Sequence, residues 1–212
     1  MNYDEYFIMC RENYSQKDKP TLEEFYTNSV IRIPTERFSK VYYESIKELS
    51  ILVKNDFDLM NDSSPMATHK DFWKYELQIE NIINELVPFL EKERFGCCLY
   101  VDKIYIYRTS KVKERSSSYL WHYDNNPSEV VKNIIYLNDV TLLNSPFEYL
   151  VHPEGKAVLM TPTRRGTKMW NPPPNNSRLT KEVESWLKEG YKSIRVEGKM
   201  GLTYSFSNDA VH

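Results

Sequence analysis

The sequence is poor in glycine and cysteine, and it contains no CxxC pair, no internal repeat and no long apolar run. An odd count of three cysteines, two of them adjacent, does not build a disulfide framework, and no zinc site of the CxxC type is expected. No apolar stretch approaches the roughly 18 residues that a membrane-spanning helix needs. Six glycines and eleven prolines leave little room for flexible linkers.

Charge of either sign is also not in excess, because the formal net charge is −2 over 212 residues. Without a basic field, neither nucleic acid nor an anionic membrane is an expected partner. The opening residues carry two acids and no basic segment, so a secretory signal is not expected. Apolar residues make up 41% of the chain, a globular balance. Together these features predict one cytoplasmic domain over residues 1–212 with reduced thiols.

The first 95 residues have the spacing of helices. Thr21 and Glu24 fit a capping box at the start of a short helix. Apolar side chains follow helical spacing over residues 36–54, and a second long helix of about twenty residues ends near Gly96. Pro88 lies inside this second helix, where the missing N–H favours a kink.

After residue 95 the residue pattern changes to short segments rich in Tyr, Val and Ile, which are typical of strands. The predicted strands lie within residues 97–109, 130–140, 145–153, 155–162 and 201–206. A short helix is predicted at about residues 178–189. A helical flank over residues 1–95 and a strand-rich part over residues 96–212 predict an α+β fold, with the helices packed on a sandwich or barrel.

The segment His122-Tyr123-Asp124 carries the strongest chemical pattern. In an extended strand, residues two apart point to the same face, so the imidazole and the carboxylate meet and Tyr123 turns away. A third ligand would complete the 2-His-1-carboxylate triad that holds non-haem Fe(II) with open coordination positions. The HxD pattern alone recurs by chance.

Three other histidines are candidates for the third ligand: His69, His152 and His212. His69 lies in a polar loop before a helix, where a capping or solvated role is expected. His152 ends a short predicted strand. His212 follows a strand and a turn, which favours a position beside the pair, although terminal residues often fray. The spacing leaves the choice open.

Residues 120–156, "LWHYDNNPSEVVKNIIYLNDVTLLNSPFEYLVHPEGK", resemble the central block of the phytanoyl-CoA dioxygenase-like Fe(II)/2-oxoglutarate oxygenases. The shared elements are an aromatic-His-x-Asp strand end, a lysine-bearing strand with Lys132, the run "YLNDV" and the run "SPFEY". The preceding "VDKIYIYRT" and the final "GKMGLTYSFSNDAVH" are similar to the strands that flank this block in the family. The resemblance covers about residues 95–212.

The resemblance implies a double-stranded β-helix, or jelly-roll, core with an N-terminal helical flank. It implies His122, Asp124 and His212 as iron ligands. It also implies an enzyme that uses 2-oxoglutarate and O2, releases succinate, and hydroxylates a small-molecule or carrier-linked metabolite. The protein contributes placement and a dry pocket, whereas the cofactor supplies the difficult step.

The sequence departs from the family pattern at two places. The family has an arginine about ten residues beyond the distal histidine, which holds the distal carboxylate of 2-oxoglutarate, and this sequence stops at His212. Either the sequence is a piece of a longer protein or another cation serves, and an arginine fork is hard to replace. Ser145 stands where the family has glycine. A turn can accept serine at this position if φ stays negative.

Two cations and three tyrosines are candidates to bind the co-substrate: Lys132, Arg108, Tyr105, Tyr107 and Tyr136. Strand alternation puts Tyr105 and Tyr107 on one face and Arg108 on the other, so only one of these faces lines a pocket. Trp121 is a candidate pocket wall, with a core aromatic as the alternative. The charged loops "RTSKVKERSSS" and "TPTRRGTK" fit a lid or simply solvated surface.

Two other functions remain open at this point. One is a non-catalytic jelly-roll binding protein that keeps the metal ligands as a vestige. The other is a metal enzyme of another class, such as a cupin-like isomerase with the same fold. Fold alone does not decide between them.

Overall fold

The computed structural model describes residues 3–16, 18–60, 64, 66–109, 119–124, 126–127, 129–160 and 178–212. Most of the loop "RTSKVKERSSS" and all of "TPTRRGTK", both singled out in the sequence, lie outside the described residues. Within the described part of the chain, no helix is long and apolar enough to cross a membrane.

The N-terminal part is largely helical, as predicted. It contains α1 (Tyr3–Glu12), α2 (Leu22–Thr27), α3 (Lys40–Leu59) and α4 (Glu76–Leu90). The capping box at α2 is confirmed, because the Glu24 N–H donates to Thr21 Oγ1 at 3.1 Å and the Thr21 N–H donates to Glu24 Oε2 at 2.7 Å.

The first long helix is shifted from its predicted bounds, whereas the second ends near Gly96 as predicted. A 3₁₀ turn over Thr35–Arg37 delays α3 to Lys40. α4 contains Pro88 and then widens into a π-helical turn over Glu91–Phe95, which ends at Gly96 with a φ of 63°. One buried stripe of α3 packs beside Ile82 of α4: Tyr42, Ile46, Leu49, Val53 and Phe57.

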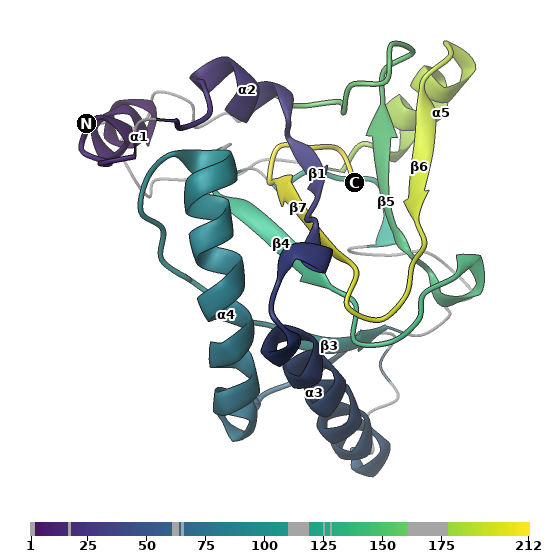
Figure 1. Cartoon of the computed structure of the whole chain (residues 1–212). Helices are drawn as coiled ribbons and strands as arrows, with labels where there is room; N and C mark the ends of the chain where they lie inside the picture. The colour runs from purple at the N-terminus through teal and green to yellow at the C-terminus, as the bar shows by residue number, and fades with distance from the viewer. Residues whose placement is uncertain are drawn as a thin grey trace.

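Seven strands form three small antiparallel sheets among the described residues (Figure 1). The central sheet has the order β1-β7-β4, with β1 (Val30–Arg32), β4 (Val131–Ile135) and β7 (Thr203–Ser207). β2 (Met66–His69) pairs with β3 (Ile106–Thr109), and β5 (Phe147–Val151) pairs with β6 (Lys192–Val196). The helix near the C-terminal end is α5 (Thr180–Lys188).

Several strand predictions need correction. The region 1–95 is not purely helical, since it contributes β1 to the central sheet and β2 to a second one. The part of the expected strand 155–162 that the structure describes, residues 155–160, forms isolated bridges at Ala157 and Leu159 in place of a continuous strand. β6 was not predicted, because Lys192 and Arg195 give it a polar pattern. A three-residue strand such as β1 is too short for any periodicity to reveal.

The turn before β5 also differs from expectation. Ser145 has a φ of 55°, in the left-handed region, so the negative φ under which a turn accepts serine is not met. A serine in this conformation is strained because its Cβ crowds the backbone. The position therefore has the geometry that favours glycine.

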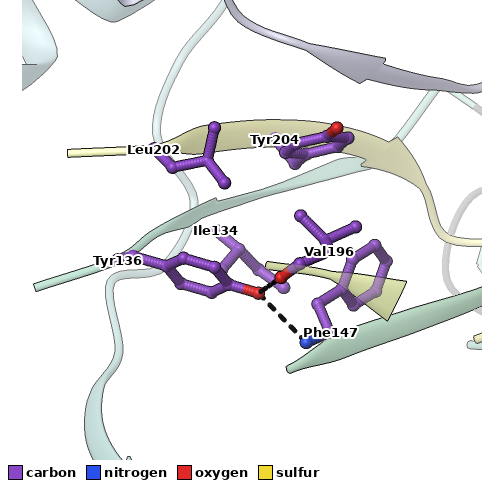
Figure 2. A pocket seen from close by; sticks show the side chains of 6 residues that line it. All are labelled: Ile134, Tyr136, Phe147, Val196, Leu202 and Tyr204. Carbon is purple, nitrogen blue, oxygen red and sulfur yellow. Dashed lines mark hydrogen bonds between the residues drawn. The ribbon is translucent and has the colours of Figure 1, made fainter. Parts of the chain in front are cut away.

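The central sheet separates α3 and α4 from the β5–β6 sheet, whereas α5 packs beside β5. On one face of β7, Thr203 is buried against the helices and its Oγ1 lies 3.0 Å from the Tyr42 hydroxyl of α3. On the other face, Tyr204 lines a narrow pocket between the two sheets. Figure 2 shows this pocket, whose lining is Ile134, Tyr136, Phe147, Val196, Leu202 and Tyr204. The chain thus has a mixed α and β fold with antiparallel sheets, and its C-terminal end lies between the central sheet and β5 (Figure 1).

Candidate metal centre

The HxD segment runs antiparallel to the last residues of the sequence. His122 and His212 exchange both backbone hydrogen bonds, each with an N–O distance of 2.9 Å, and the Asp124 N–H donates to the Asn208 carbonyl at 2.7 Å. Residues that are directly opposite in an antiparallel pair point to the same face. His212 therefore stands beside His122, and Asp124 shares that face because it lies two residues along.

The three side chains converge. One ligand atom from each of His122, Asp124 and His212 lies within 4.8 Å of the other two. His212 Nε2 is 3.5 Å from Asp124 Oδ2, and the two imidazole centroids are 4.3 Å apart. Tyr123 turns to the opposite side and is buried with Leu150, as alternation predicted. Of the three candidate histidines, the structure brings His212 to the pair.

Both imidazoles are held in the tautomer that leaves Nε2 available to a metal. Nδ1 of His122 lies 2.8 Å from the Leu120 carbonyl oxygen, and Nδ1 of His212 lies 2.8 Å from the Ala210 carbonyl oxygen. Because a carbonyl only accepts, each Nδ1 carries the proton and each Nε2 keeps its lone pair. Carbonyl oxygens of this kind orient metal-binding histidines in many proteins.

Burial favours the neutral form of both rings. It lowers the pKa of His122, and it lowers the pKa of His212 to about 4, with the neighbouring His122 adding to the effect. Both imidazoles are therefore neutral at neutral pH, the form in which histidine binds a metal. Two imidazole nitrogens and one carboxylate oxygen on one face fit a divalent transition metal.

Lys132 is the predicted cation that lies at this centre. Its ammonium donates to Asp124 Oδ2, and β4 places it directly opposite Phe206 of β7. Its side chain is about half exposed, and that of Asp124 is about a quarter exposed. The ammonium supplies positive charge to a carboxylate that also faces two neutral imidazoles.

β3 separates the predicted tyrosine from the predicted arginine. Arg108 Nη1 donates to the Phe57 carbonyl at 3.2 Å, and its guanidinium lies 5.4 Å from the centroid of the Phe57 ring, so it faces α3. Tyr107 leaves β3 on the face opposite Arg108, and burial, with a contribution from the Asp124 carboxylate, raises the pKa of its phenol. Tyr107 keeps 47% of its surface exposed, and Tyr105 lies just before the strand and is more exposed.

Two other predicted aromatics have packing roles. The Tyr136 hydroxyl donates to the Val196 carbonyl at 2.8 Å and accepts from the Phe147 N–H at 3.0 Å, so it joins the end of β4 to β5 and β6 (Figure 2). Trp121 packs on the cluster that contains Tyr123, on the side away from the His122 imidazole. Trp121 is therefore a core aromatic, which was the alternative to a pocket wall.

Aromatic rings border His212 on the sheet side. The centroid of the Phe206 ring lies 4.9 Å from that of His212, and the Phe147 centroid lies 5.9 Å away. The two phenylalanine centroids are 4.6 Å apart. These rings connect the candidate metal centre to the pocket between the sheets and keep water from that side of the imidazole.

The other two histidines lie elsewhere. The expectation that His69 is solvated or caps a helix is wrong. It belongs to β2 and is only 6% exposed. Its Nε2 lies 3.2 Å from Asp56 Oδ2 and 3.1 Å from the Tyr75 hydroxyl. The His152 ring lies beside that of Tyr191, with a centroid distance of 5.0 Å and a tilt of 46° between the ring planes.

Two arginines were not identified from the sequence. Arg178 pairs with His122 across an isolated antiparallel bridge. Arg94, only 2% exposed, donates from Nη2 to Ser207 Oγ at 3.2 Å and to the Ser29 carbonyl at 3.1 Å on the helix side of the central sheet. For an arginine at a helix end, the sequence pattern predicts exposure to solvent. No local signal therefore indicates that Arg94 is buried.

Comparison with family models, with curated protein sequences and with solved structures finds no match to this chain.

Proposed function

We propose that this chain is a non-haem Fe(II)- and 2-oxoglutarate-dependent dioxygenase of the phytanoyl-CoA dioxygenase-like family, acting on a small-molecule or carrier-linked metabolite. The convergence of His122, Asp124 and His212 carries the proposal. Two nitrogens and one oxygen on one face constitute a facial triad, which leaves coordination positions open for a co-substrate and oxygen. The fixed Nδ1–H tautomers support the same role.

A jelly-roll core is part of the proposal. Its support is the antiparallel pairing of every sheet described, with α3 and α4 on one face of the central sheet and β5–β6 on the other. Isolated bridges extend this pairing from β5 to Ala157 and from Leu159 to Ala210, which ties the C-terminal segment into the strand layer. The ligands then lie at the end of adjacent strands, where such folds carry their sites.

His122, Asp124 and His212 would hold Fe(II), which together with 2-oxoglutarate and O2 supplies the oxidation of an unactivated C–H bond. The carbonyls of Leu120 and Ala210 orient the imidazoles. Lys132 adds positive charge beside the carboxylate, which favours an anionic co-substrate. Phe147 and Phe206 limit water beside His212, which strengthens electrostatic interactions there.

An anaerobic titration with Fe(II) and 2-oxoglutarate tests the proposal. We expect a weak visible charge-transfer band, which is lost in His122→Ala and in Asp124→Ala. His152→Ala is the matched control, since it removes a histidine that lies outside the cluster, and it should keep the band. Failure of the unaltered protein to bind Fe(II) would contradict the proposal.

One observation favours a second candidate, the non-catalytic binding protein with a vestigial site. Lys132 already supplies Asp124 with a cation, so the carboxylate does not need a metal for charge balance. Aerobic incubation with Fe(II) and 2-oxoglutarate separates the two. Release of succinate, even without a substrate, supports the oxygenase and argues against a cupin-like isomerase, whereas bound 2-oxoglutarate without succinate supports the binding protein.

A further inference from the structure

Two cysteines that are far apart in the sequence lie at the contact between α1 and the turn that ends α4. Cys97 is buried in a hydrophobic cluster, and Cys10 of α1 packs against that same cluster. The third cysteine, Cys98, follows Cys97 and is exposed. All three thiols are free, so the fold brings two reduced cysteines to one cluster.

Contacts of two neighbouring residues fix α1 on this turn. The ring centroid of Phe7 lies 6.2 Å from that of Phe95, and Arg11 Nη1 donates to the Phe95 carbonyl. Residues three and four apart are neighbours on a helix surface, so Cys10 lies beside Phe7 on the same side of α1. The register of α1 therefore places Cys10 beside the segment that runs from Phe95 to Cys97.

The two segments approach each other closely at Gly96. A Cβ added there would lie 2.8 Å from Lys19 Cβ and 3.0 Å from Arg11 Nη1, so the backbone of the turn runs directly against these side chains. The positive φ of 63° also favours glycine at this position. Each cysteine is the chain neighbour of a residue in this contact, because Cys10 precedes Arg11 and Cys97 follows Gly96.

The two thiols differ in accessibility and in acidity. Burial raises the pKa of the Cys97 thiol to about 11, and the nearby Cys10 thiol adds to the effect while the Arg11 charge opposes it. The thiolate is the nucleophile, so Cys97 is a poor first reactant at neutral pH. Cys10 is only partly buried, and a small reagent can reach it.

We propose that Cys10 and Cys97 form a modification site, at which a low-molecular-weight disulfide of the glutathione type joins the two cysteines. The Cys10 thiolate attacks one sulfur of the reagent, forms a mixed disulfide and releases one thiolate. The Cys97 thiolate then attacks Cys10 Sγ and displaces the second thiolate of the reagent. The two cysteines are oxidised, the reagent is reduced to two thiols, and the protons lost by the cysteines pass to the released thiolates.

The disulfide ties α1 covalently to the end of α4. A cross-link between residues so far apart in the sequence restricts the unfolded chain, so the oxidised protein should be more resistant to urea. The pair lies in the helical flank and includes no residue of the metal centre, so this inference is independent of the proposed function.

Mass spectrometry of the full chain after incubation with oxidised glutathione tests the pair. We expect an internal disulfide in the unaltered protein and in Cys98→Ser, seen after non-reducing proteolysis as peptides that join Cys10 to Cys97. Cys97→Ala, which keeps the buried position apolar, should instead retain glutathione on Cys10, because the resolving thiol is missing. Cys10→Ser should form no internal disulfide. Cys98→Ser is the matched control, since it removes the adjacent but exposed thiol.

Urea denaturation gives a second readout. The oxidised unaltered protein should unfold at a higher urea concentration than the reduced protein, and dithiothreitol should restore the lower midpoint. A lasting glutathione adduct on Cys10 of Cys98→Ser without an internal disulfide would refute the pair, as would a bond that joins Cys10 to Cys98 in the unaltered protein. Binding of Co(II), an oxygen-stable metal, should be equal in both redox states, so refutation of the pair leaves the metal centre standing.

Discussion

Among the described residues, two clusters pair a buried histidine with an aspartate, and one of the two is arranged for a metal. The first joins His122 and Asp124 to His212. The second joins His69 of β2 to Asp56 of α3 and to the Tyr75 hydroxyl. Burial and residue types are similar in both.

The difference lies in which imidazole nitrogen the protein uses. In the first cluster, backbone carbonyls take Nδ1 of both histidines and leave each Nε2 facing the carboxylate. In the second, Nε2 of His69 already contacts Asp56 and Tyr75. The Tyr75 hydroxyl also donates to Asp56 Oδ2 at 2.5 Å, and Lys74 Nζ lies 3.5 Å from the same oxygen. A histidine and an aspartate in contact therefore indicate a metal site only when the imidazole nitrogen that faces the carboxylate is not already used within the protein.

Removal of one metal ligand should give the largest effect that separates the two clusters. We expect His212→Ala to weaken Co(II) binding by more than about 100-fold, because loss of a ligand exceeds the 10–100-fold typical of a residue that only supports one. His69→Gln should leave the affinity unchanged. Calorimetric titration of both variants measures this. Equal affinity of His212→Ala and the unaltered protein would remove His212 from the ligand set.

The second prediction concerns Arg94, which connects the helical flank to the strand that leads to His212. Its guanidinium donates to the hydroxyls of Ser205 and Ser207. Burial lowers its pKa to about 10 and the charge of Asp209 opposes the shift, so it remains a cation at neutral pH. Arg94→Met leaves the buried Asp209 without this positive charge, and we expect a loss of about 3 kcal/mol in the free energy of unfolding.

Urea denaturation measures this loss. Metal affinity should fall as well, since Ser207 precedes the turn whose Asn208 carbonyl accepts from the Asp124 N–H. Tyr42→Phe is the control, because it removes a hydrogen bond to Thr203 at the other end of β7. It should lower stability but leave metal affinity unchanged. A similar fall in metal affinity in both variants would show that Arg94 acts only through overall stability.

A third, smaller effect is expected in the second cluster. Tyr75→Phe removes the hydroxyl that donates to Asp56, and a hydrogen bond to a charged group contributes about 1.5–3 kcal/mol. Unfolding should become easier by roughly that amount, with no change in Co(II) affinity. A loss of metal binding in this variant would mean that the two clusters are coupled, contrary to their separate hydrogen-bond networks.

The sequence was informative where chemistry depends on local spacing. The i, i+2 alternation placed His122 with Asp124 and turned Tyr123 into the core, and the capping box at Thr21 marked the start of α2. It failed where the contact is distant in the chain. His69 is defined by Asp56 and by pairing with Ile106, neither of which leaves a periodic pattern.

Arg178 is a second residue whose neighbours could not be predicted from local sequence. Its pairing with His122 joins positions 56 residues apart. The sequence analysis considered cations near the HxD pattern, Lys132 and Arg108, because proximity along the chain was the available guide. Strand register, which sets neighbours across a sheet, is fixed by burial of residues such as Leu179 rather than by the residues that carry chemistry.

The smallest expected effect is at Ser145, where the resemblance and the structure can be compared directly. Its positive φ costs a residue with a Cβ about 1–2 kcal/mol, and glycine removes that strain while adding about 0.4–1 kcal/mol of unfolded-state entropy. We therefore expect Ser145→Gly to stabilise the protein by roughly 0.5–1 kcal/mol. Thermal unfolding against Ser193→Gly, a serine within β6 where glycine should destabilise, measures the difference. Destabilisation by Ser145→Gly would mean that the serine side chain makes a compensating interaction, and the glycine of the family would then lack a backbone explanation at this turn.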